Sequence, residues 1–217
     1  MSPGLETELK LLAQDAALHA LAAIDGLGPA TLGPPRTVAE SDVYLDTPAG
    51  ALAAARWACR LRSREGRRVI SCKGPAQHAP GAALHRRPEV EGLAPDGAMR
   101  GAIGWPSSDA RDLVLRLAGD QPLVERVTLR QQRTERTARV DGLGIGTLSL
   151  DRVKVEHGGM LLGGFAVVEL ELSDGVDVAR LGGVIEALLA WPGLVPDGLS
   201  KLERALALAE GAAGAPR

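Results

Sequence analysis

Charged residues stand at every second position in several short segments of this sequence, and this spacing limits what the chain can fold into. Glu6, Glu8 and Lys10 are each two residues apart. Side chains alternate between the two faces of a β-strand, so these three lie on one face and the residues between them on the other. The pattern predicts strands with one charged face, and it recurs at Arg60, Arg62 and Arg64, at Arg87, Glu89 and Glu91, and at Glu169 and Glu171.

A single strand of this kind is typical of an antiparallel sheet with one face in water. Two of the strands, however, carry paired carboxylates, Glu6 with Glu8 and Glu169 with Glu171, and like charges on one face repel unless a cation lies between them. Oxygen ligands without a His or Cys cluster favour Mg²⁺ or Mn²⁺. Four basic residues of these strands could bind the oxyanion groups of a polyanion that the metal also contacts. They are Arg60, Arg62, Lys73 and Arg87. If the sheet closed into a barrel, its lumen would be lined with both positively and negatively charged side chains.

Composition excludes several classes of function. The 217 residues carry 25 Lys and Arg against 27 Asp and Glu, so no overall positive charge attracts nucleic acid or an anionic membrane. Only 2% of the residues are aromatic, which leaves few platforms for base stacking. The five arginines within residues 60–68 are therefore not interpreted as a nucleic-acid patch. No apolar stretch is long enough to span a membrane and no signal peptide is evident, so we expect a cytoplasmic protein.

Hydrophobic periodicity predicts an α+β protein with mostly antiparallel strands. Strands are expected at residues 5–11, 38–46, 57–64, 69–73, 86–91, 123–140, 148–156 and 165–172. Helices are expected at 12–24, from a Ser108 cap to 117, at 178–189, and from a Ser200 cap to 208. No linker divides the chain, so we expect one domain over residues 1–209 and a disordered tail over 210–217.

Several smaller features have ordinary structural interpretations. The glycines between Gly142 and Gly146 predict a hairpin turn rather than a nucleotide-binding loop. Cys59 and Cys72 lack metal-ligand spacing and are expected to be buried, free thiols. The four histidines are scattered, so each is expected on the surface or on a helix, and none is assigned a catalytic role. They are His19, His78, His85 and His157.

The segment Glu6-Thr7-Glu8-Leu9-Lys10 matches the Glu-x-Glu-x-Lys signature of the CYTH domain, the triphosphate tunnel metalloenzymes. Tyr44-Leu45-Asp46-Thr47-Pro48 resembles the second-strand motif of that family. Later segments resemble its successive motifs in the same order: Arg60-Leu61-Arg62, Ser71-Cys72-Lys73-Gly74-Pro75, Arg87-Pro88-Glu89-Val90-Glu91, Leu150-Asp151, Val168-Glu169-Leu170-Glu171 and Ser200-Lys201. The resemblance covers Leu5 to about Leu208. The seven ordered matches that follow the first motif make the resemblance specific, whereas the first motif alone is not.

The resemblance implies a closed eight-stranded antiparallel β-barrel with peripheral helices, a tunnel, Mg²⁺ or Mn²⁺, and a linear triphosphate-bearing substrate. It assigns phosphate-binding roles to Lys10, Arg60, Arg62, Lys73, Arg87, Arg133 and Lys201. It assigns the metal to Glu6, Glu8, Glu169 and Glu171, with Asp151 and Glu91 placed to hold a second metal or orient water. Lys73, Lys201 and Glu91 are the expected catalytic residues.

Three positions depart from the family pattern. Arg130, Arg133 and Arg136 are three apart and cannot all face inward on a regular strand, and we favour Arg133. Val153 stands where some members have a basic residue, so the site either lacks one cation or uses Arg152 or Lys154 after a bulge. Pro88 suits an edge or bulged position, which leaves the direction of Glu89 open.

The function that these residues favour is metal-dependent hydrolysis of tripolyphosphate or an organic triphosphate. The alternatives are a polyphosphate-binding module without turnover and, with less support because aromatic residues are scarce, an adenylyl cyclase of the same fold. Neither nucleic acid nor a membrane is an expected partner. The sequence leaves the oligomeric state open, with a homodimer as one form to test, and it does not choose among tripolyphosphate, thiamine triphosphate and nucleoside triphosphates.

Overall fold

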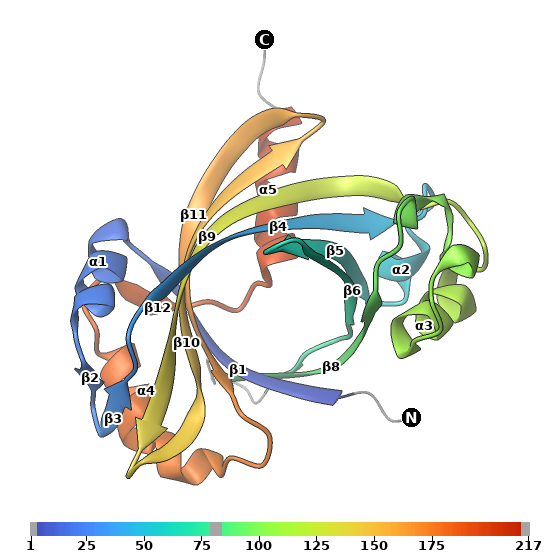
Figure 1. The fold of residues 1–217 in the computed structure, drawn as a ribbon. Coiled ribbons are helices and arrows are strands. Elements are labelled where there is room, and N and C mark those ends of the chain that lie inside the picture. Colours follow the sequence, from blue (N-terminus) through green and yellow to red (C-terminus); the bar gives the residue numbers. More distant parts are fainter. Residues whose placement is uncertain (1–3, 79–83, 214–217) are drawn as a thin grey trace.

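The computed structural model describes residues 4–78 and 84–213 and forms a closed antiparallel β-barrel (Figure 1). The barrel closes because β10 pairs with both β9 and β11. The eight strands, in order around it, are β1 (Gly4–Ala13), β8 (Leu84–Leu93), β6 (Arg67–Lys73), β5 (Ala58–Arg64), β4 (Arg36–Asp46), β9 (Val124–Val140), β10 (Leu143–His157) and β11 (Met160–Leu172). The predicted fold class is confirmed.

Short strands and helices surround the barrel. The additional strands are β2 (Gly26–Leu27), β3 (Ala30–Leu32), β7 (Gln77–His78) and β12 (Leu194–Pro196). The α-helices are α1 (Asp15–Ala23), α2 (Ala51–Ala54), α3 (Asp109–Ala118), α4 (Gly182–Leu189) and α5 (Lys201–Ala213). Three short 3₁₀ helices cover Ala98–Arg100, Ala102–Gly104 and Val178–Leu181. No helix in the described ranges is long and apolar enough to cross a membrane.

The element boundaries differ from the predicted ones in a few places. The first strand continues to Ala13, so α1 begins at Asp15 rather than at residue 12. Ser108 caps α3 as predicted, because its Oγ accepts the N–H of Arg111 at 3.2 Å. Helix α5 continues to Ala213, so residues 210–213 are helical rather than part of the expected tail, and residues 214–217 lie outside the described range. The hairpin turn after Val140 is confirmed, with positive φ at Asp141 and Gly142.

Two apolar clusters lie on the outside of the barrel. Helices α1 and α4 pack over β1, β10 and β11, whereas α2 and α3 pack over β5 and β6 (Figure 1). The second cluster contains Cys59 and Cys72, both buried and free as predicted. The residues between the charged positions thus form the outer core, which leaves the charged faces for the lumen.

The third apolar cluster lies inside the barrel and packs against α5. It combines Tyr44, Val127, Leu129, Val153 and Val155 from the strands with Ala205 of the helix. Leu202 and Leu206 of α5 pack against the same cluster. One part of the lumen is therefore an apolar core filled by α5, and the charged cavity occupies the rest.

The arginines of β9 separate as strand alternation requires. Arg133 faces the lumen, as predicted, whereas Arg130 lies outside and pairs with Glu156 at 2.9 Å. Arg136 also lies on the outer side, but its side chain is only 1% exposed. Its guanidinium donates to main-chain carbonyls around the end of α1, those of Leu21, Ala22, Ile24, Leu32 and Gly33, and to the side chain of Asp25. Arg136 therefore serves as a buried C-terminal cap for α1.

We expect Arg136→Met to lower the free energy of unfolding by about 2–4 kcal/mol, because it leaves several buried carbonyls without a donor. Urea or thermal unfolding measures the effect. Arg139→Met is the matched control, since Arg139 lies on the same strand and is exposed, and it should change stability little. Equal stability of the two variants would contradict the capping role.

Candidate active site

The barrel encloses a cavity of about 470 Å³, a volume within the usual range for small-molecule sites. Its wall combines residues from seven strands with residues from α2 and α5. The predicted site residues that line it are Glu6, Glu8, Lys10, Arg60, Arg62, Lys73, Arg87, Glu91, Arg133, Glu169, Glu171 and Lys201. Asp151 is fully buried behind this wall. The strands thus bring nearly all of the predicted residues to one cavity.

One wall holds Glu6 and Glu8 against two cations. The Nζ of Lys73 lies 2.5 Å from Glu6 Oε1. The Nε of Arg87 donates to Glu6 Oε2 at 2.9 Å, and its Nη2 donates to Glu8 Oε1 at 2.5 Å. Burial alone would raise the pKa of Glu6, but the charges of Lys73 and Arg87 outweigh it and lower that pKa to about 2. Glu6 is therefore ionised at neutral pH.

Next to this wall the carboxylates crowd one another. Glu8 and Glu171 are directly opposed across β1 and β11. Burial and the charges of Glu169 and Glu6 raise the pKa of Glu8. Burial and the charges of Glu6 and Glu8 likewise raise the pKa of Glu171, whose carboxylate forms no hydrogen bond or ion pair with any other described residue. The repulsion between Glu6 and Glu8 is the one that the sequence spacing predicts, whereas Glu171 is repelled by these two residues of β1 rather than by Glu169.

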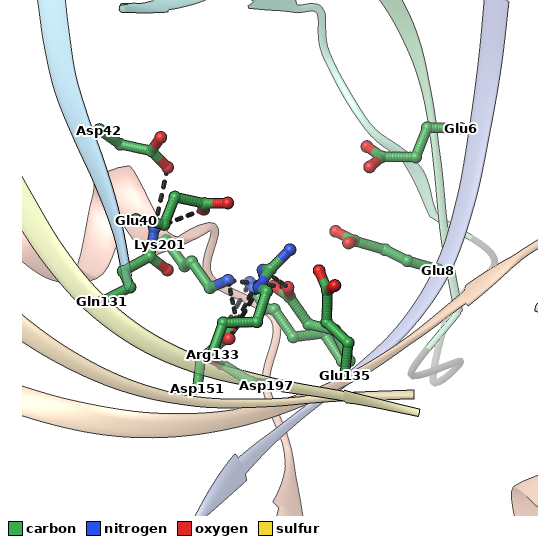
Figure 2. A network of polar contacts seen from close by, with 12 residues as sticks. Glu6, Glu8, Glu40, Asp42, Gln131, Arg133, Glu135, Asp151, Asp197 and Lys201 are labelled. Atoms are coloured by element: carbon green, nitrogen blue, oxygen red, sulfur yellow. Dashed lines mark hydrogen bonds and ion pairs between the residues drawn. The ribbon is translucent and has the colours of Figure 1, made fainter. Parts of the chain in front are cut away.

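Arg133 and Lys201 form a second charged cluster with Asp151 and Glu169. Figure 2 shows Arg133, Lys201 and Asp151 of this cluster together. Lys201 Nζ lies 2.6 Å from Asp151 Oδ2 and 2.8 Å from Glu169 Oε2. Arg133 Nη2 lies 2.7 Å and 3.1 Å from the same two oxygens. Burial would raise the pKa of Glu169, but Lys201 and Arg133 outweigh it and hold that pKa well below its usual value. Both carboxylates of this cluster are already neutralised by cations.

The start of α5 explains the position of Lys201. Ser200 Oγ accepts the N–H of Glu203 at 3.1 Å, and Glu203 Oε2 accepts the N–H of Ser200 at 2.7 Å. This reciprocal capping box fixes the first turn of the helix at the lumen. The Ser-x-x-Glu spacing of Ser200 and Glu203 is visible in the sequence and is the signature of this box. Lys201 is a buried lumen residue, with its side chain 6% exposed.

The loop before α5 is attached to the lumen by polar contacts. Lys10 Nζ donates to the carbonyl of Leu199 and lies 3.9 Å from Asp197 Oδ2. Nε2 of His85 lies 3.1 Å from the Asp197 carbonyl oxygen. His85 is buried and lines the cavity, so its expected surface or helix position is wrong. It lies on β8 two residues before Arg87 and therefore shares the inward face.

Several lumen residues were not assigned to the site from the sequence. Glu40 and Asp42 of β4 are fully buried near the arginines of β5, and Gln131 of β9 contacts both. Glu40 and Asp42 are two residues apart, the same signal that identified the other strands, whereas Gln131 carries no charge and has no such signal. Glu89 faces inward, where Ser71 Oγ donates to it at 2.5 Å.

The two remaining departures from the family pattern are also resolved. Pro88 lies where the pairing of β8 with β6 ends, so no hydrogen bond of that ladder is lost. Val153 packs in the apolar cluster, and the register shift of β10 falls beyond it, after Val155. Arg152 pairs with Asp15 on the outside, so no bulge brings it or Lys154 into the cavity. The position of Val153 supplies no cation.

Comparison with known proteins agrees with this fold. The family model of the CYTH domain matches residues 4–206. The chain belongs to the CYTH family. HpAC1 from Hippeastrum, named as an adenylyl cyclase with a dominant triphosphatase activity, has 23% identity and a TM-score of 0.68, with 95% of this chain and 96% of that chain covered. A protein from Bacillus halodurans named as an adenylate cyclase has 20% identity and a TM-score of 0.61, with 94% and 98% covered. At these identities the likeness shows the fold.

A comparison with curated proteins finds no match.

The carboxylates of the site differ in how well they fit a metal ion. No ready-made cluster of three or more His, Cys, Asp or Glu ligands occurs within residues 4–78 and 84–213. Glu8 and Glu171 nevertheless repel each other and carry hard oxygen donors, which suit Mg²⁺ or Mn²⁺. Asp151 and Glu169 are instead bound to Arg133 and Lys201. Glu8 and Glu171 therefore fit a divalent cation better than Asp151 and Glu169, and Glu6 lies beside them although it is paired with Lys73 and Arg87.

Proposed function

We propose that this protein hydrolyses the terminal phosphoanhydride bond of tripolyphosphate or of an organic triphosphate. The observation that carries the proposal is the cavity inside the closed barrel, which is lined on several sides by cations and, beside them, by carboxylates that repel one another. Lys10, Arg60, Arg62, Lys73, Arg87, Arg133 and Lys201 would neutralise the phosphate oxygens. Such a lining suits a small, highly charged anion.

A divalent ion held by Glu6, Glu8 and Glu171 would supply Lewis-acid stabilisation of the charge on the transferred phosphoryl group. The protein itself positions the chain of phosphates through its lysines and arginines. Glu91 lines the cavity, and burial together with the charge of Glu89 raises its pKa. A carboxylate in that environment suits the orientation of the attacking water. No covalent nucleophile is required, because water attacks the terminal phosphorus directly.

The direct test is phosphate release from tripolyphosphate, thiamine triphosphate and ATP, each with Mg²⁺ and with Mn²⁺. Metal-dependent release from at least one of them supports the proposal, and the panel ranks the substrates. If the protein retained long polyphosphate on a column but released no phosphate, its function would be polyphosphate binding rather than hydrolysis. If the protein formed cyclic AMP from ATP, its activity would be that of an adenylyl cyclase.

Divalent cations should stabilise the protein more at about pH 8 than at about pH 5. The raised pKa values of Glu8 and Glu171 mean that folding favours their protonated forms, so their contribution to stability is present at low pH and is lost as pH rises through the folded pKa. A bound cation replaces those protons at high pH. Glu6 does not interfere, because it titrates near pH 2.

Thermal melting with and without Mg²⁺ across this range measures the effect. Glu171→Gln should flatten the pH dependence, since it removes one of the two repelling carboxylates. Adding tripolyphosphate together with the metal should raise the melting temperature more than either alone. A metal effect that does not change with pH would argue against a site on Glu8 and Glu171.

A further inference from the structure

Two buried aspartates, Asp42 on β4 and Asp151 on β10, hold arginines of the cavity in the same way. Both are fully buried, and neither lines the cavity. Arg62 donates to the two oxygens of Asp42 through Nε and Nη2, both at 2.8 Å. Arg133 donates to the two oxygens of Asp151 through the same two nitrogens, at 2.8 Å and 2.7 Å. Nη1 of each arginine forms no hydrogen bond with any described residue.

Each aspartate also binds a second cation of the cavity wall. Arg60 Nη1 lies 3.3 Å from Asp42 Oδ2, and Lys201 Nζ lies 2.6 Å from Asp151 Oδ2. Figure 2 shows the two aspartates on different strands, with Arg133 and Lys201 gathered at Asp151. Each aspartate therefore holds its own pair of cations, Arg60 and Arg62 at Asp42 and Arg133 and Lys201 at Asp151.

Gln131 provides a further hydrogen bond to the Asp42 carboxylate. Its Nε2 donates to Asp42 Oδ2 at 3.0 Å and to Glu40 Oε1 at 3.1 Å (Figure 2). Glu40 is also fully buried, and its Oε1 lies 2.8 Å from Arg62 Nη2. The amide thereby links two carboxylates that would otherwise repel, and the Asp42 carboxylate is held from both sides.

Buried carboxylates in a cavity for anions need a reason, because each one repels the phosphates that the cavity would bind. A metal ligand must reach the cavity, whereas these two groups lie behind their cations. Burial would raise the pKa of Asp42, but Arg60 and Arg62 outweigh it and lower that pKa, so the carboxylate is charged and held by its arginines at neutral pH. Their position and contacts suit orientation of the guanidinium groups.

We propose that Asp42 and Asp151 are positioning residues that orient Arg62 and Arg133 for a triphosphate before it binds. Asp151 accordingly acts through Arg133 and Lys201 and is not a metal ligand. A guanidinium recognises phosphate through a planar fork, so its orientation decides how many hydrogen bonds it can donate. Orientation in advance also avoids the entropy cost of ordering two long side chains upon binding. This inference rests on the proposed triphosphate function.

The variants Asp42→Asn and Asp151→Asn test the inference in two binding measurements. The first is calorimetric titration with tripolyphosphate in the presence of EDTA, and the second is Mn²⁺ binding by electron paramagnetic resonance without tripolyphosphate. We expect affinity for tripolyphosphate to fall by about tenfold or more in both variants, because an amide places an N–H group against an arginine N–H and loses the bidentate contact. Mn²⁺ affinity should change by less than about twofold.

Double variants show whether each aspartate acts through its arginine. Asp42→Asn should cause a smaller further loss of tripolyphosphate affinity in an Arg62→Ala background than in the unmodified protein, and Asp151→Asn likewise in an Arg133→Ala background, because each aspartate then acts only through its second cation, Arg60 or Lys201. Arg62→Lys keeps the charge but lacks the fork, so it should lose about as much affinity as Asp42→Asn. If an asparagine variant does not fold, Arg62→Lys tests the inference in its place.

Asp46→Asn is the control for burial. Asp46 is a buried aspartate of the same strand, and its carboxylate accepts the backbone N–H groups of Thr47, Leu52 and Ala53. This change should lower the melting temperature and leave tripolyphosphate affinity unchanged.

Three results would overturn the inference: unchanged tripolyphosphate affinity in the asparagine variants, additive losses in the double variants, or weaker Mn²⁺ binding by Asp151→Asn. Each of them leaves the proposed function standing as long as the unmodified protein binds tripolyphosphate. Failure of the unmodified protein to bind it would remove both the proposed function and the inference.

Discussion

Replacing Glu8 by Gln is expected to abolish triphosphate hydrolysis while leaving the protein folded. Glu8 is buried at the cavity beside Glu6 and opposite Glu171. The substitution removes one negative charge and keeps the volume, so the proposed divalent site loses one of its oxygen ligands. Turnover measured with tripolyphosphate at saturating Mn²⁺ gives the result.

Stability should respond much less than activity to this change. The raised pKa of Glu8 shows that burial and the neighbouring carboxylates already disfavour its charged form. A neutral amide relieves that repulsion, although it weakens the contact with Arg87. Glu156→Gln, which alters a partner of Arg130 on the outer surface, is the matched control and should keep normal activity. Near-normal turnover by Glu8→Gln would remove the proposed role of Glu8 as a metal ligand.

The barrel could be predicted because the sequence pattern that specifies each strand is local. Alternation of charged and apolar residues assigns each strand two faces, and a register slip of one residue would bury every charge in the outer core. The same rule correctly places Arg133 inside and Arg130 and Arg136 outside. Its limit is shown by Gln131 and His85, which share inward faces with charged residues but have no pattern of their own.

Side-chain contacts between residues that are distant in the sequence could not be predicted in this way. Asp151 and Glu169 were both expected to hold a metal, and their ion pairs with Arg133 and Lys201 depend on how three strands and a helix meet. Val153 shows the same limit, since alternation places it inward two residues after Asp151, but an apolar side chain suits that position because α5 packs against it. Tertiary packing decides such positions, and spacing along the chain carries no signal for them.

Lys201 illustrates how burial can reverse a prediction made from the helix alone. A lysine in the first turn of a helix opposes the helix dipole, so removal of an exposed one leaves stability unchanged or raises it slightly. Lys201 is buried and donates to Asp151 and Glu169. Its removal takes a donor from two buried carboxylates, which is costly even though Arg133 still contacts both.

We therefore expect Lys201→Met to reduce triphosphate hydrolysis by about tenfold or more and to lower the free energy of unfolding by about 1–3 kcal/mol at neutral pH. The lowered pKa of Glu169 means that its stabilising contribution is present above its usual value of 4.5 and is lost as pH falls through the folded pKa. The stability deficit of the variant should therefore shrink on acidification. Steady-state kinetics and urea unfolding at several pH values measure the two effects.

Lys154→Met, at an exposed lysine of β10, is the matched control and should change neither quantity. A loss of stability without a loss of activity would make Lys201 a purely structural residue of the lumen. A loss of activity accompanied by a stability deficit that persists at low pH would mean that the ion pairs with Asp151 and Glu169 are not what Lys201 contributes to the fold. Together, the two measurements separate the contact of Lys201 with phosphate from its contact with the carboxylates.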